Sequence, residues 1–297
     1  MTLRLATRRS PLALVQATRV QGLLEHCGLE SELVLVETRG DGDATTDLSI
    51  LGGQGAFAVE VQRAVLAGDA DAAVHSAKDL PSLTPEGLVL ASVPERLDAS
   101  DVLVGRSLAG LGPGARVATG SPRRRALLLE RRPDVEVVPL RGNMATRLAH
   151  VGRDGVDAII TALAALDRLG ESALVSERLD PEWFTPQVGQ GALALEARGD
   201  DAATLAALNE INVAPALLAV TAERAYLEEL GAGCAIPTGA HATVRGGLVT
   251  LRGVMLEAEG AASVRGEFSG ADPLELGKRL AQYLRDDLGG GAFVAGL

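Results

Sequence analysis

The feature of the sequence that most constrains the fold is a regular alternation of short apolar segments with helical segments over the first two thirds of the chain. The strand-like segments are residues 3–7, 32–38, 72–75, 88–92, 102–105, 116–119, 136–140 and 158–161. Helical periodicity fills residues 11–27, 56–67, 122–132, 144–151 and 163–169. Because strands and helices that alternate with short connections build α/β layers, the pattern predicts an α/β fold with largely parallel sheets.

Two turn clusters, at residues 94–98 and 185–189, are the expected points at which the chain crosses between two such lobes. We expect the second lobe to be inserted into the first, with a hinged cleft between them and the chain returning near residues 191–197. This interpretation gives domain 1 as residues 1–95 and 190–210, and domain 2 as residues 96–189.

The last part of the chain, residues 211–297, has a different pattern. A helical segment precedes three strand-like segments and a closing helix, at residues 214–230, 240–245, 248–255, 262–268 and 273–288. The first two strands are separated by Gly246-Gly247, and a two-residue glycine loop is typical of a tight hairpin. The pattern predicts a small α+β third domain with a three-stranded antiparallel sheet.

The balance of charge excludes several classes of partner. The 297 residues include 28 Lys and Arg against 39 Asp and Glu, a net charge of −11, so the surface as a whole should repel nucleic acid and anionic membrane. Aromatic residues are 2% of the chain, too few for platforms that stack bases. No apolar run approaches the roughly 18 residues of a membrane span, and the N-terminus lacks the apolar stretch of a signal peptide. We therefore expect a cytoplasmic protein that binds neither nucleic acid nor membrane.

Arginines are concentrated at a few places in this acidic chain. All but two of the cationic residues are arginines, and many of them fall at Arg8, Arg9, Arg123, Arg124, Arg125, Arg131, Arg132, Arg141 and Arg147. The guanidinium group binds carboxylate and phosphate through paired hydrogen bonds, so the clusters indicate a binder of small anions.

Three helix starts share one design. Ser10-Pro11 and Ser121-Pro122 each follow a strand and offer a serine N-cap with proline at the first helical position, and Arg141-Gly142-Asn143 opens a third helix. Arginine next to the positive end of a helix is unfavourable unless an anion compensates it. Each arginine alone could lie on a solvated helix face, but three such starts at strand ends favour a polycarboxylate or phosphate ligand.

The segment His75-Ser76-Ala77-Lys78-Asp79-Leu80-Pro81 ends an apolar strand. Asp79 has two interpretations: a turn residue before Leu-Pro, or a carboxylate near the cationic walls that stabilises positive charge or moves protons. His75 is interpreted as a structural histidine.

The chain has two cysteines, which excludes a disulfide framework. Neither has a Cys or His neighbour at zinc spacing, so we expect no metal site. Cys234 lies in the small-residue loop Gly231-Ala232-Gly233-Cys234-Ala235, which suits covalent attachment, although a small buried side chain is the alternative. Cys27, at a helix C-terminus, is interpreted as structural.

These pieces occur together, in the same order, in one family. The chain resembles porphobilinogen deaminase, also called hydroxymethylbilane synthase, over essentially its whole length. The resemblance is carried by Ala6-Thr7-Arg8-Arg9-Ser10-Pro11-Leu12-Ala13, Thr38-Arg39-Gly40-Asp41, the segment from His75 to Pro81, Arg141-Gly142-Asn143 with Thr146-Arg147-Leu148, Val188-Gly189-Gln190-Gly191-Ala192, and Gly233-Cys234 with Ile236-Pro237.

The resemblance implies a transferase of tetrapyrrole (heme) biosynthesis that acts as a monomer. It implies two lobes like those of periplasmic binding proteins, a third domain, and a dipyrromethane cofactor held by a thioether to Cys234. Such an enzyme deaminates four porphobilinogen molecules and joins them head to tail into hydroxymethylbilane, with release of ammonia.

By motif position, the resemblance also implies the roles of the site residues. The catalytic carboxylate falls on Asp79. The cofactor contacts fall on Cys234, Lys78, Ser76, Ser121, Arg123, Arg124, Thr119 and Arg147. The substrate contacts fall on Arg8, Ser10, Arg141, Arg147, Arg168 and Gln190.

The sequence departs from the family pattern at three positions. Gln54, in Gly52-Gly53-Gln54-Gly55, stands where the family usually has lysine, so a carboxylate contact there is in doubt. Pro122 replaces a common leucine and Ala232 replaces a glycine. Two rival functions remain to be weighed: a non-catalytic two-lobed binding protein for a small polycarboxylate, which leaves Cys234 without a role, and a nucleic-acid binder using residues 123–132, which the net charge opposes.

Overall fold

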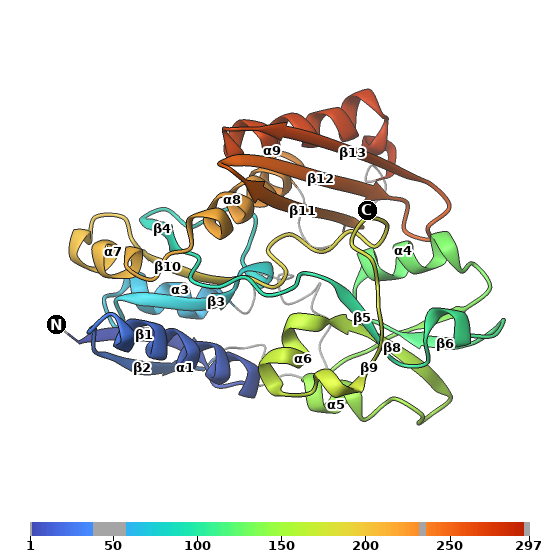
Figure 1. The fold of residues 1–297 in the computed structure, drawn as a ribbon, viewed down its shortest axis with the longest axis horizontal. Helices are drawn as coiled ribbons and strands as arrows, with labels where there is room; N and C mark the ends of the chain where they lie inside the picture. Colours follow the sequence, from blue (N-terminus) through green and yellow to red (C-terminus); the bar gives the residue numbers. More distant parts are fainter. Residues whose placement is uncertain (1, 38–57, 232–235, 294–297) are drawn as a thin grey trace.

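The computed structural model describes residues 2–37, 58–231 and 236–293, and these residues form three sheets with their helices (Figure 1). Two five-stranded sheets lie side by side in the lower half of Figure 1, and a three-stranded sheet lies above them. The α/β class with a third antiparallel domain is therefore confirmed. The domain boundaries at residues 95, 189 and 210 stay a prediction.

The first sheet has the order β2-β1-β3-β10-β4. Its strands are β1 Leu3–Arg8, β2 Ser31–Val36, β3 Ala72–Ser76, β4 Leu88–Ser92 and β10 Leu193–Arg198. Strand β1 runs parallel to β2 and β3, whereas β10 runs antiparallel to β3 and β4. Helices α1 (Pro11–His26) and α7 (Ala202–Asn209) cover one face, where Leu3 and Leu5 point. Helix α3 (Val59–Leu66) covers the other, where Ala6 and Ala73 point, as strand alternation requires.

The second sheet has the order β7-β6-β8-β5-β9. Its strands are β5 Asp101–Gly105, β6 Arg116–Ala118, β7 Glu136–Val138, β8 Val156–Ala162 and β9 Val175–Arg178. Helix α4 (Pro122–Arg131) packs on one face, and α5 (Met144–Leu148) and α6 (Leu163–Leu169) pack on the other. The prediction of largely parallel sheets is confirmed, since four strands of each sheet run in one direction. The exceptions are β10 in the first sheet and β5 in the second, each of which runs antiparallel to both of its neighbours.

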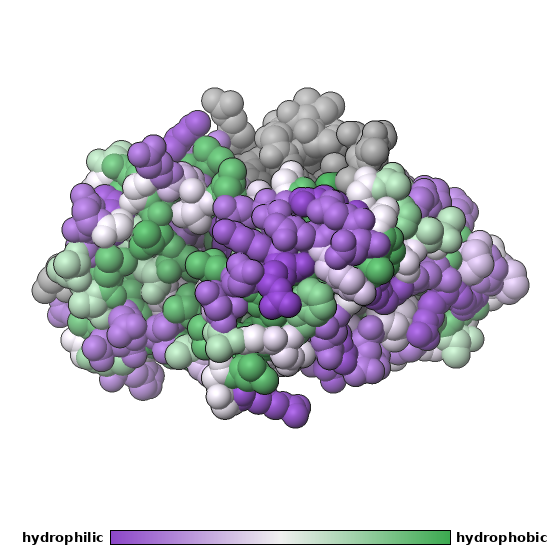
Figure 2. Space-filling model, turned by 90° about the horizontal axis from the view of Figure 1, so that it is seen from above, coloured by the Kyte–Doolittle hydropathy of each residue, from purple (hydrophilic) through white to green (hydrophobic). Residues whose placement is uncertain are grey.

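The third sheet is the antiparallel meander β11 Thr238–Arg245, β12 Leu248–Leu256 and β13 Ser263–Gly270. The predicted hairpin is confirmed, since Gly246 and Gly247 join β11 and β12 with φ of 57° and 80°. Helices α8 (Ala214–Glu229) and α9 (Pro273–Gln282) pack on one face around Tyr226 and Leu280. A single π-helical turn, Tyr283–Asp287, extends α9. The face seen from above in Figure 2 is hydrophilic at its centre, where α9 is solvated.

The two segments in which the chain crosses between the first and second sheets lie side by side and antiparallel to each other. Arg96 forms an antiparallel bridge with Ala192, and the backbone N–H of Leu97 donates to Gly191 O at 3.1 Å. Helix α8 joins them, because the buried Glu223 carboxylate accepts from the Gly189 N–H (2.7 Å) and pairs with Arg96 (2.8 Å). The third sheet and both crossings are thus tied together at one point.

Of the helices among the described residues, none is long and apolar enough by itself to cross a membrane; α7 and α8 pass that test only as a sharply bent pair.

Candidate active site

Six of the predicted site residues, Arg8, Ser10, Ser76, Lys78, Asp79 and Arg168, line a cleft between the first and second sheets. One open cavity of about 380 Å³ is lined by residues that include Arg8, Ser10, Gln16, Ser76 and Asp79. A second, of about 270 Å³, shares Gln16 and Ser76 with the first and extends to Lys78, Arg168 and the crossing at Gly189. The cleft therefore has walls from both sheets and from the segment that joins them.

Asp79 ends a 3-10 turn, Ala77–Asp79, directly after β3. Its side chain is half-buried and lines the first cavity. In the part of the chain that the structure describes, its carboxylate has no hydrogen-bond or ion-pair partner. The charges of Lys78 and Arg147 are nevertheless close enough for Asp79 to favour their ionised forms. A carboxylate in this setting is available to a positive charge that forms in the cleft.

The turn that holds Asp79 has little room. Gly189 has a φ of 72°, and a Cβ there would lie 2.8 Å from the carbonyl carbon of Ala77. Gln187 Nε2 donates to Lys78 O at 3.2 Å. The second crossing therefore packs directly on the backbone that carries Lys78 and Asp79.

The first helix start has the predicted geometry. Ser10 caps α1, since its Oγ accepts from the Ala13 N–H at 3.4 Å. Gln16, which was not among the predicted residues, donates its Nε2 to Ser76 Oγ at 2.7 Å and lines both cavities. It could have been found as a polar residue on the stripe that α1 buries with Ala17, Val20 and Leu24.

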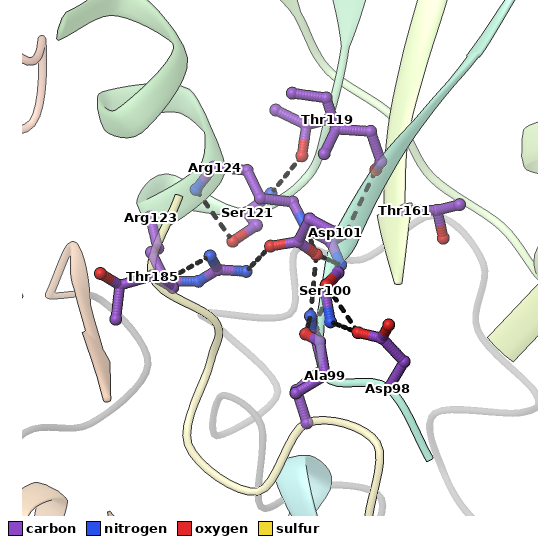
Figure 3. A network of polar contacts seen from close by, with 12 residues as sticks. Asp98, Ala99, Ser100, Asp101, Thr119, Ser121, Arg123, Arg124, Thr161 and Thr185 are labelled. Carbon is purple, nitrogen blue, oxygen red and sulfur yellow. Dashed lines mark hydrogen bonds and ion pairs between the residues drawn. The ribbon is translucent and has the colours of Figure 1, made fainter. Parts of the chain in front are cut away.

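The second helix start also has the predicted cap, because Ser121 Oγ accepts from the Arg124 N–H at 3.4 Å. Its two arginines point inward, to Asp101 at the start of β5 (Figure 3). Arg123 Nη2 lies 2.7 Å from Asp101 Oδ2, and Arg124 donates to Asp101 Oδ1 through Nε (2.9 Å) and Nη2 (2.7 Å). The side chains of Asp101, Arg123 and Arg124 are 0%, 3% and 8% exposed.

Asp101 balances part of the charge of these arginines. Burial opposes its ionisation, but Arg123 and Arg124 outweigh burial and hold the pKa of Asp101 below its usual value. Gln190 belongs to the same buried network, since its Nε2 donates to Ala99 O (2.6 Å) and Asp101 Oδ1 (3.0 Å). The three ionised groups leave one net positive charge beside the cleft. Asp101 was not predicted, since its only signal in the sequence is an acidic residue at the start of an apolar strand.

Lys78 is the cation nearest to Asp79 in sequence, and its side chain is half-buried. Burial, aided by the charge of Arg124, lowers the pKa of Lys78 to about 8. Among the described residues, its amine has no hydrogen-bond or ion-pair partner. The amine is thus a donor available to a ligand.

The remaining predicted residues lie around the second sheet. Thr119 Oγ1 accepts from the Ser121 N–H (3.2 Å), and Arg147 Nε donates to Gly142 O (2.8 Å). Arg168 lines the second cavity and donates to Gly191 O (2.8 Å). Arg141 lies exposed before α5, and this helix begins after Asn143 as predicted. The Asn143 side chain caps it by accepting from the Thr146 N–H at 2.9 Å.

Some of the residues singled out in the sequence are not described by the structure, and others lie away from the two cavities or at their edge. Cys234, Ala232, Gln54 and the motif at residues 38–41 lie outside the described residues. His75 is buried with Nε2 3.3 Å from the Glu196 carboxylate, as expected of a structural histidine. Cys27 follows α1 at its C-terminal end, with an exposed side chain. The described part of the chain contains no cluster of three or more metal-ligating side chains.

Two family profiles match the chain. The one described as "Porphobilinogen deaminase, dipyromethane cofactor binding domain" matches residues 3–206, and the one described as "Porphobilinogen deaminase, C-terminal domain" matches residues 217–286. The chain belongs to the porphobilinogen deaminase family. The cofactor-binding profile spans both five-stranded sheets and thus the whole cleft.

Curated relatives agree with the profiles. The chain is 43% identical to the porphobilinogen deaminase of Trichlorobacter lovleyi over 95% of this chain and 92% of that one. It is 44% identical to the porphobilinogen deaminase of Roseiflexus sp. (strain RS-1) over 99% of both chains, and 45% identical to that of Xanthomonas axonopodis pv. citri over 96% of both. Among solved structures, it is similar to the methionine binding protein MetQ, with a TM-score of 0.45 and 14% identity over 71% of this chain and 89% of that one.

Proposed function

We propose that this member of the porphobilinogen deaminase family deaminates four porphobilinogen molecules and joins them head to tail into hydroxymethylbilane, on a covalently bound dipyrromethane primer and with release of ammonia. The observation that carries the proposal is the unpaired Asp79 carboxylate, which lines a cleft whose walls are cationic. The alternative of a non-catalytic binding protein for a polycarboxylate is not favoured, because it gives the cofactor-binding domain no role.

The cleft suits a cofactor that bears carboxylates. The Lys78 amine has no partner among the described residues, and the buried Nε atoms of Arg123 and Arg168 have no hydrogen-bond acceptor. Such orphaned donors are costly unless a ligand satisfies them. We assign cofactor carboxylates to Lys78, Ser76, Ser121, Thr119, Arg123, Arg124 and Arg147, and attachment to Cys234. When bound, the dipyrromethane supplies the pyrrole carbon to which the first substrate unit is added.

Asp79 is the proposed catalytic residue. As ammonia leaves the aminomethyl group of porphobilinogen, positive charge develops on the pyrrole, and a fixed carboxylate stabilises that charge. Because Asp79 has no competing partner within the described part of the chain, its carboxylate is available for this purpose.

The acetate and propionate groups of the substrate need cationic and hydroxyl partners. For these we propose Arg8, Ser10, Arg141, Arg147, Arg168 and Gln190. Arg8 and Ser10 line the cavity that contains Asp79, and Arg168 lines the adjoining one. Gln190 lies within the Asp101 network, so its contribution would depend on a movement of the crossing that carries it.

We also propose that the protein is a cytoplasmic monomer. We propose that it binds neither nucleic acid nor membrane, which its net charge of −11 supports. We also keep the three domains at residues 1–95 with 190–210, 96–189 and 211–297, which the three separate sheets support.

The decisive test is the intact mass of the purified protein together with ammonia release from porphobilinogen. An excess of one dipyrromethane on the Cys234 peptide and release of four ammonia molecules per hydroxymethylbilane are expected. A protein that gains no mass and releases no ammonia on incubation with porphobilinogen would refute the proposal.

A further inference from the structure

One arginine of the third sheet's helix α8 holds the loop that follows Asp79. Arg224 Nη1 donates to Pro81 O at 3.0 Å, and its Nη2 donates to Ser82 O at 3.4 Å and to Thr84 Oγ1 at 3.0 Å. The residue is 8% exposed. Three neutral oxygens within four residues of one loop are thus bound by a single guanidinium.

The partners of Arg224 distinguish it from the other buried arginines. Arg123 and Arg124 both pair with the carboxylate of Asp101, whereas no carboxylate lies within ion-pair distance of Arg224 among the described residues. Burial lowers the pKa of Arg224, and the charges of Glu196 and Glu228 only partly oppose this effect. A buried guanidinium that is bound by neutral oxygens instead of a carboxylate is energetically costly. We infer that this arrangement fixes the shape of the loop.

The rest of the loop is held by α8 as well. Leu80, which directly follows Asp79, is 3% exposed and packs in one cluster with Ala216 and Val220 of α8. On the other side of Asp79, strand β3 and the packing of Gly189 on Ala77 fix the chain. The Asp79 carboxylate is therefore positioned by the sheet before it and by α8 after it.

We propose that Arg224 is a positioning residue: by holding Pro81, Ser82 and Thr84 it keeps the Asp79 carboxylate in place in the cleft. The inference rests on the proposed function of Asp79. It makes the orientation of the catalytic carboxylate depend on α8, the helix that leads into the loop of the cofactor cysteine.

The test compares Arg224→Met and Arg224→Lys with the control Arg198→Met. Arg198 also donates to two backbone carbonyls of the first sheet's domain, Val65 O (2.8 Å) and Ala70 O (2.9 Å), but it does not line the cleft. Each variant is measured for intact mass, for kcat and KM with porphobilinogen, and for amide hydrogen exchange of the peptide covering residues 79–87.

We expect Arg224→Met to retain the cofactor mass and a KM within about twofold of the wild type, but to lose about tenfold to a hundredfold in kcat, as a displacement of order 1 Å does. Exchange in residues 79–87 should rise in Arg224→Met and not in Arg198→Met. Arg224→Lys, which can reach one or two of the three oxygens, should recover part of the lost kcat.

Three outcomes would overturn the inference. The first is a kcat of Arg224→Met within twofold of that of Arg198→Met. The second is a fall in kcat with unchanged exchange in residues 79–87. If Arg224→Met does not fold, Thr84→Val and Arg224→Lys are measured in its place. The third outcome that would overturn the inference is then a wild-type kcat in both of these variants. Wild-type protein that releases no ammonia would instead refute the proposed function itself.

Discussion

The buried pair of arginines on Asp101 gives a quantitative prediction for the substitution Asp101→Asn. The change keeps the shape of the side chain but removes its charge. It also turns an amide N–H₂ toward the donors of Arg123 and Arg124, which now lie 2.7 to 2.9 Å from the carboxylate oxygens.

The expected cost follows from the burial of all three side chains, which are 0%, 3% and 8% exposed. Removing one partner of a buried ion pair leaves uncompensated charge and costs about 3–5 kcal/mol. A control lies on α4, the helix that carries Arg123 and Arg124. Its Glu130 pairs with Arg265 at 2.8 Å, and their side chains are 24% and 36% exposed. Because such a half-exposed pair is screened by water, Glu130→Gln should cost about 1 kcal/mol or less.

Urea unfolding of the holoprotein followed by circular dichroism measures both costs, provided that the urea dependence has the same slope in all variants. The pH dependence gives a second check. The pKa of Asp101 is lowered in the folded protein, so its contribution is fully present above its unfolded pKa of about 3.9 and is lost as pH falls through the folded value. The gap between wild type and Asp101→Asn should therefore be constant from pH 7 to about pH 5 and shrink in more acidic solution.

The reasoning would be wrong if Asp101→Asn lost no more stability than Glu130→Gln. It would also be wrong if the gap between wild type and Asp101→Asn widened on acidification.

Four further predictions concern the site. Asp79→Asn should keep its cofactor mass and lose nearly all ammonia release, and near-normal turnover would contradict its assigned role. Cys234→Ser should carry no thioether-linked cofactor, and a wild-type mass excess on the variant would place the attachment elsewhere. Because the pKa of Lys78 is lowered to about 8, its ammonium is lost as pH rises through that value, so KM for the anionic substrate should rise above pH 8. Lys78→Arg should remove this pH dependence, and an unchanged KM profile would rule Lys78 out as its source. Gly189→Ala places a Cβ 2.8 Å from Ala77 at a φ of 72°, so both the urea midpoint and kcat should fall, and an unaltered midpoint would show that the turn is looser than described.

The sequence predicted well those features that depend on neighbouring residues. The caps Ser10 and Ser121, the prolines after them, the helix start at residues 141–143 and the Gly246-Gly247 hairpin each depend on a few consecutive residues, and all are confirmed. The family motifs likewise contain residues that line the two cavities, among them Arg8, Ser76 and Asp79, whereas their roles stay a prediction.

Features set by distant partners could not be predicted. The direction of Arg123 and Arg124 depends on Asp101, more than 20 residues earlier in the chain, and the clamp of Arg224 depends on a loop 140 to 143 residues away. Strand β9, four residues at a sheet edge with every second side chain exposed, has no apolar run to mark it. Helix α7 was missed because its alanine-rich sequence has no clear apolar stripe.

The place of β10 in the first sheet has a consequence for the order in which the protein can fold during synthesis. Strand β10 lies between β3 and β4, yet it follows the whole second sheet in the chain. Until residue 198 has left the ribosome, β3 and β4 therefore cannot be joined, and the strand edge of β3 next to Asp79 stays open. The second sheet, from β5 to β9, is complete before that point and is free to fold first, as domains generally do when they emerge as continuous segments. The emerging chain thus carries two unpaired strand edges through the synthesis of about a hundred residues, the interval in which it most needs protection from aggregation.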